Sequence, residues 1–89
     1  MDFNQATFTT KYVIETKSTV VYVSHDKDGW QFFGAEKEIK DEDMRIISLK
    51  NMLKLNPHVK KILWISEGME AWINDENEEW QTGVATYEG

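Results

Sequence analysis

Carboxylates are the residues of this chain with the greatest capacity for chemistry. They stand close together at 41–43 and from Glu76 to Glu79. General acid–base catalysis needs one such group to be desolvated in a pocket, whereas runs of adjacent acids are usually solvated. Ser24 and His25 are neighbours, but on a strand their side chains point to opposite faces. The chain has no nucleophile elbow, phosphate-binding glycine loop or dinucleotide fingerprint, so we expect no enzyme activity and no catalytic residue.

The stretch Asp26-Lys27-Asp28-Gly29 has the outline of a calcium-binding loop. With Gly29 at the sixth position, Ser24 would stand first and Ala35 twelfth, where an EF-hand needs an acid and a bidentate glutamate. His25 and His58 have no spacing that would make them a pair of zinc ligands. We therefore expect a charged hairpin turn at 26–29, with no metal and no other cofactor.

The charge of the chain is unevenly distributed. Residues 1–66 carry nine acids and ten bases, whereas residues 67–89 carry seven acids and no base. The net charge of −6 argues against nucleic acid as a partner, because phosphate binding needs a basic surface. The acidic segment has two interpretations: it steers a basic protein partner, or it only keeps this end of the chain solvated.

Aromatic residues make up 12% of the chain, including four tryptophans. We expect Trp30, Trp64 and Trp72 to build the core. Trp80 stands beside Glu78 and Glu79, and a tryptophan within a charged rim is typical of an interface hot spot. The alternative is that Trp80 packs across a hairpin on Trp72.

The composition bounds the class of protein. The 89 residues correspond to one domain, spanning 1–89, and the absence of cysteine excludes a disulfide framework or a thiol nucleophile. The longest apolar runs have four or five residues, far fewer than the ~20 that cross a bilayer. The first residues lack the pattern of a signal peptide. We expect a cytoplasmic protein with no membrane partner.

The first half of the chain predicts strands. Residues 1–9 are either a loose lead-in or a short edge strand, and 11–16 have the β-branched and aromatic residues of a strand. The apolar segment 20–24 predicts a central strand. A four-residue loop at 26–29 would lead into a return strand at 30–33, pairing His25 with Trp30 and Val23 with Phe32.

The second half predicts helices followed by a hairpin. Residues 35–44 are a charged connection, 45–47 a short extended run, and Ser48 an N-cap for a helix to about 55. Asn56-Pro57 restarts a second helical segment. A three-residue loop, 75–77, would place Asn77 in the left-handed region and Trp72 opposite Trp80, and 84–87 would add an edge strand. These elements predict an α+β fold: a mostly antiparallel sheet of about five strands with one or two short helices packed on it.

Several of these segments together resemble a known family. They are the run from Val20 to Gly34, containing Gly29-Trp30-Gln31-Phe32, then Ile46-Ile47-Ser48-Leu49, Asn56-Pro57 and Glu67-Gly68. Over roughly residues 10–75 the chain is similar to small bacterial domains grouped with the immunity proteins of polymorphic toxin systems (immunity class thirty-three, formerly a domain of unknown function). The resemblance implies a protein that binds and blocks a toxin and has no catalytic residues of its own.

Two hypotheses for function follow from these observations. In the first, the chain is a non-catalytic protein that neutralises a cognate toxin by binding its basic surface. In the second, it is a structural or regulatory domain without a toxin partner, dimerising through a strand at Lys11–Thr16 or the C-terminal strand. The candidate binding residues are acids and tryptophans: Asp26, Asp28, Trp30, Glu67, Glu70, Trp72, Asp75, Glu76, Glu78, Glu79 and Trp80.

Overall fold

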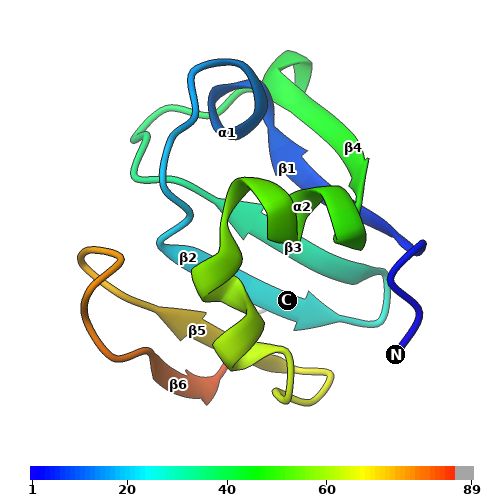
Figure 1. Cartoon of the computed structure of the whole chain (residues 1–89), viewed down its shortest axis with the longest axis vertical. Helices are drawn as coiled ribbons and strands as arrows, with labels where there is room; N and C mark the ends of the chain where they lie inside the picture. The colour runs from blue at the N-terminus through cyan, green and yellow to red at the C-terminus, as the bar shows by residue number, and fades with distance from the viewer. Residues whose placement is uncertain (86–89) are drawn as a thin grey trace.

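A six-stranded mixed sheet forms the body of the protein in a computed structural model that describes residues 1–85 (Figure 1). The strand order is β4-β1-β3-β2-β5-β6, and every neighbouring pair is antiparallel except β1 and β3. The predicted α+β class is confirmed, with six strands where about five were expected. The elements are β1 Ala6–Thr10, α1 Lys11–Glu15, β2 Tyr22–Asp26, β3 Gly29–Phe33, the 3-10 helix η1 Asp41–Asp43, β4 Met44–Ser48, α2 Leu49–Leu55, the 3-10 helix η2 Pro57–Ile62, β5 Met69–Trp72 and β6 Gln81–Val84.

The N-terminal segment differs from the prediction. Residues 6–10 form an interior strand between β4 and β3, and the segment 11–15 is a helix, not the expected strand. Thr10 explains the switch, because its hydroxyl accepts a hydrogen bond from the backbone N–H of Val13 and caps the helix. Val13 is then fully buried in the core. The segment Lys11–Thr16 therefore offers no strand edge for dimerisation.

The β2–β3 hairpin has the predicted register. His25 pairs with Trp30 and Val23 with Phe32, and the ring of His25 stacks on that of Trp30 with centroids 4.0 Å apart. The turn is tighter than expected, because Asp26 pairs with Gly29 and leaves only two residues between the strands. Gly29 has a φ of 119°, a conformation that favours glycine. β2 lies between β3 and β5, which confirms its predicted central position.

Helices α2 and η2 cover one face of the sheet (Figure 1). Ser48 caps α2 as predicted, its hydroxyl accepting from the N–H of Asn51. η2 is a 3-10 helix whose buried residues, Val59 and Ile62, are three positions apart, and the buried Ile65 beyond its end continues this spacing. The core lies between these helices and the side chains of β2, β3 and β5 that face them.

The C-terminal hairpin departs from the prediction most clearly. β5 and β6 are joined by an eight-residue connection, 73–80, and Trp72 pairs with Gln81 rather than with Trp80. Trp80 instead stacks on the ring of His58 and donates its indole N–H to the backbone oxygen of His58. Asn77 is not left-handed, since Lys17 is the only described non-glycine residue with positive φ. Of the predicted strand 84–87, Val84 ends β6, and 86–87 lie outside the described residues.

Two of the three predicted core tryptophans are also placed differently. Trp30 is buried, but Trp64 is 64% exposed and Trp72 is 40% exposed. Trp64 falls between the buried positions of the three-residue spacing, so it points away from the core. Across residues 1–85, no helix has the length and apolar character to cross a bilayer.

Candidate functional site

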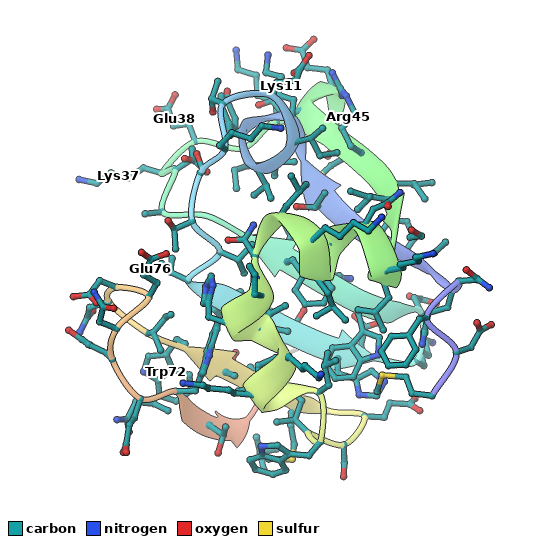
Figure 2. The ribbon with its side chains drawn as sticks, in the orientation of Figure 1. Lys11, Lys37, Glu38, Arg45, Trp72 and Glu76 are labelled. Carbon is teal, nitrogen blue, oxygen red and sulfur yellow. The ribbon has the colours of Figure 1, made fainter. Side chains whose placement is uncertain are left out.

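The predicted acidic segment is a hairpin at one edge of the sheet, and its carboxylates fall into two groups. Because β5 runs antiparallel to β2, Glu67 lies at the same end of the sheet as the β2–β3 turn. The other acids, Asp75 to Glu79, lie in the β5–β6 connection at the opposite end. Figure 2 shows Glu76 and Trp72 at the hairpin side of the molecule, away from Lys11 and Arg45. We call residues 67–85 the acidic hairpin.

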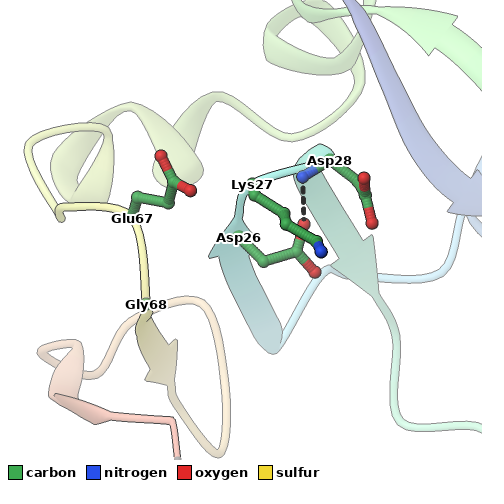
Figure 3. Close-up of a pocket in the computed structure, with 5 residues that line it drawn as sticks. All are labelled: Asp26, Lys27, Asp28, Glu67 and Gly68. Atoms are coloured by element: carbon green, nitrogen blue, oxygen red, sulfur yellow. Dashed lines mark hydrogen bonds between the residues drawn. The ribbon is translucent and has the colours of Figure 1, made fainter.

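The group at the β2–β3 turn surrounds a hollow of about 480 Å³ (Figure 3). Asp26, Lys27 and Asp28 form one side of it, and Glu67 and Gly68 form the other. Asp26 is held in place because its carboxylate accepts from the backbone N–H of Asp28 at 2.8 Å and from the side chain of Gln31 at 3.2 Å. Three carboxylates around a single lysine give this hollow a negative charge suited to a cationic side chain.

Glu70 and Trp72 lie between the two groups, on the sheet face opposite the helices. The register places both on the same face as Tyr22 and Ser24. The Glu70 carboxylate accepts a hydrogen bond from the Tyr22 hydroxyl, and Ser24 donates to Gln31 at 3.1 Å. The indole of Trp72 lies over Gly83 on β6, where a side chain would come within about 3.4 Å of the ring. This face of β5 is therefore polar along its length and ends in a half-exposed tryptophan.

The group in the β5–β6 connection is organised by its own hydrogen bonds. Asp75 accepts from the backbone N–H groups of Asn77 and Glu78. A second hollow, of about 340 Å³, separates this connection from η2 and is lined by Lys61, Ile62, Trp64, Asn77, Glu78, Glu79, Trp80 and Thr82. Two indoles and two carboxylates around one space are the groups that bind a guanidinium or ammonium, by cation–π and charge-assisted contacts. Lys61 is the only base that lines this hollow, so with Glu78 and Glu79 the lining has a net negative charge.

The acidic hairpin also lacks internal charge compensation. The one ion pair in the described part of the chain joins Lys11 to Asp43 at 3.2 Å, far from the hairpin. The backbone N–H of Lys40, together with the Lys11 ammonium, holds the pKa of Asp43 below its usual value, and Asp43 in turn raises the pKa of Lys11. No such ion pair forms with any hairpin carboxylate.

The predicted binding residues are therefore divided. Asp26, Asp28 and Glu67 meet at one hollow, and Glu78, Glu79 and Trp80 at another. Trp30 is 2% exposed and lies in the core, where it cannot contact a partner. Trp64 was not among the predicted binding residues, although the three-residue spacing of Val59, Ile62 and Ile65 would have placed it outside the core.

Residues 1–85 contain no cluster of three or more His, Cys, Asp or Glu side chains arranged to hold a metal ion. Comparisons with known protein families, curated proteins and solved structures found no match for the chain.

Proposed function

We propose that this protein is a non-catalytic binding domain whose acidic hairpin recognises a basic surface on a partner protein. The supporting observation is that the six described carboxylates of the hairpin form no ion pair and have no base within 67–85, whereas residues 1–66 carry ten bases beside nine acids. Unpaired charges of one sign on an exposed segment raise the association rate of an oppositely charged protein. The two hollows, each richer in carboxylates than in lysines, give individual basic side chains places to bind.

The finer proposal is an immunity-type role in the cytoplasm of a bacterium, where the domain would neutralise a toxin by occupying its basic surface. It is supported by the resemblance of residues 10–75 to immunity proteins and by the acidic hairpin. A toxin gene beside the gene for this chain would identify the partner, and co-expression should then rescue cells from that toxin. Failure of rescue with a folded, expressed protein would contradict the immunity role.

The binding proposal is tested by reversing charge in two matched places. One variant replaces Glu76, Glu78 and Glu79 by lysine. The control variant replaces three other exposed glutamates by lysine: Glu15, Glu38 and Glu42. Both variants change the net charge by the same amount. We expect the hairpin variant to associate with a basic partner at least about tenfold more slowly at low salt, with a much smaller loss in the control. Equal slowing in both variants would show that only net charge matters.

A further inference from the structure

The two edges of the sheet differ in how their outward backbone groups are satisfied. In an antiparallel pair, alternate residues point their backbone N–H and C=O groups toward the neighbouring strand and away from it. The N–H of Leu49 donates to the oxygen of Gln5, so the backbone groups that point away from β1 are those of Met44, Ile46 and Ser48. The N–H of Met44 donates to the oxygen of Asp41, and its oxygen accepts from the guanidinium of Arg45. Ser48 begins helix α2. Only Ile46 presents both backbone groups without such a partner.

Within residues 1–85, nothing bonds to the outer edge of β6. The bond from Ala85 N–H to Gly68 oxygen shows that Gly83 and Gln81 face β5, so Thr82 and Val84 direct their N–H and C=O groups outward. No described residue bonds to these four groups, and both side chains are exposed, Val84 to 78%. The strand Gln81–Val84 contains no proline and no charged residue. Proteins usually protect an exposed strand edge with such residues, lysine above all.

The open edge lies beside the hollow that contains two indoles. Thr82 pairs with Ala71, and Ala71 with Val23, so all three share the face covered by the helices. Thr82 itself lines the hollow with Trp64, Glu78 and Glu79. A residue placed opposite Thr82 on an added strand would share this face, and its side chain would point toward the hollow.

Charge decides between the possible occupants of this edge. A second copy pairing through β6 would bring together two hairpins that each carry six acids and no base within 67–85. Repulsion between the two sets of carboxylates disfavours such a dimer. A strand that carries arginine or lysine is complementary to both the edge and the hollow.

We propose that β6 binds an extended, basic segment of a partner protein as a seventh strand, with an arginine or lysine opposite Thr82 entering the hollow between Trp64 and Glu78–Glu79. This inference rests on the proposed function and adds the binding mode to it.

The test uses the full chain and a synthetic peptide, Lys-Thr-Val-Arg-Val-Thr-Lys, in three forms: unmodified, N-methylated at arginine and both threonines, and N-methylated at both valines. When the peptide runs antiparallel to β6 with its arginine opposite Thr82, the first methylated set is the one whose N–H groups point at β6, and the second set is the one whose N–H groups point away. All forms have the same charge and side chains. We expect methylation of the arginine set to weaken binding by at least about tenfold, and methylation of the valines to change it by less than about threefold.

A protein variant gives the reciprocal test. Val84→Pro removes an outward N–H without removing a bond to β5, and Val84→Thr keeps that N–H. We expect Val84→Pro to weaken the unmodified peptide about tenfold and Val84→Thr to bind as the original chain does. Should Val84→Pro fail to fold, the methylated peptides still decide the question with the unaltered chain. Equal binding of all three peptides would overturn strand addition and leave a purely electrostatic binding function, whereas no binding by any of them would contradict both proposals.

Discussion

The edges of the sheet, β4 and β6, show two ways of treating polar groups that the sheet leaves unpaired. Beside β4, the chain uses its own residues: Arg45 and Asp41 bond the backbone of Met44, and Lys11 pairs with the buried Asp43. Beside β6, the backbone groups of Thr82 and Val84 have no such partners among residues 1–85, and the hairpin carboxylates form no ion pair. At the first edge the chain bonds Met44 and leaves Ile46 with both outward backbone groups unbonded among the described residues, whereas at the second edge both outward residues, Thr82 and Val84, are available for binding.

The largest effect expected from this comparison concerns burial. Phe32 on β3 is fully buried, so Phe32→Ala should lower the free energy of unfolding by about 3–5 kcal/mol. Val84→Ala on β6 should change it by no more than about 0.5 kcal/mol, because Val84 is exposed. Urea unfolding of both variants measures the difference. A cost at Val84 comparable to that at Phe32 would mean that β6 is part of the folding core.

A smaller difference is expected between two threonines on the same sheet face. Thr9 on β1 is fully buried and donates its hydroxyl to the oxygen of Phe32 at 2.8 Å, so Thr9→Val should cost about 1–2 kcal/mol. Thr82→Val at the open edge should cost less than about 0.5 kcal/mol. Thermal unfolding of the matched pair checks this, and equal costs would contradict the assignment of β6 as a free edge.

The pH dependence of stability should show the contribution of the buried Asp43 beside β4. The pKa of Asp43 is lowered in the folded state, so its contribution is fully present above the unfolded value, about 3.9, and is lost as the pH falls through the lower folded value. Asp43→Asn should therefore flatten the loss of stability below about pH 4. The original chain is the comparison. Chemical unfolding at a series of pH values distinguishes them, and identical curves would show that Asp43 makes no special contribution.

The smallest effect should be on self-association. Because Met44 is bonded at one edge and like charges surround the other, light scattering at micromolar concentration should give the mass of one chain. A dimer mass that persists in Val84→Pro would locate pairing at β4, and one lost in that variant would locate it at β6; either would contradict this expectation.

Local patterns predicted the local parts of the fold. The glycine in the β2–β3 turn and the apolar residues around it gave the register of His25 with Trp30, and Ser48 was recognisable as a helix cap. The parallel pairing of β1 with β3 was not predictable in this way, since it depends on contacts between segments far apart in sequence. The helix at 11–15 was also not predicted, because its residues have strand propensity. The hydroxyl of Thr10 caps it by accepting a hydrogen bond from the N–H of Val13.

The candidate site was predicted in composition but not in arrangement. The sequence contained the one-signed charge of the acidic hairpin, and the structure divides it between the two ends of β5. Trp80 was expected either in an exposed interface or on Trp72, but it packs on His58, which is 22 positions away. An edge strand was predicted at 84–87, and the structure places the edge strand β6 at Gln81–Val84. Its bounds and its neighbour β5 are set by pairing across the eight-residue connection, which the local pattern did not predict.

The most direct test of the central claim is a map of backbone amide shifts as the unmodified peptide, Lys-Thr-Val-Arg-Val-Thr-Lys, is titrated into the isotopically labelled chain. The acidic hairpin should respond, with the largest shifts at Thr82 and Val84 and at Trp64 beside the hollow, while 41–48 should remain unchanged. Shifts centred on 41–48, or small shifts spread evenly over the chain, would contradict the assignment of β6 as the binding edge.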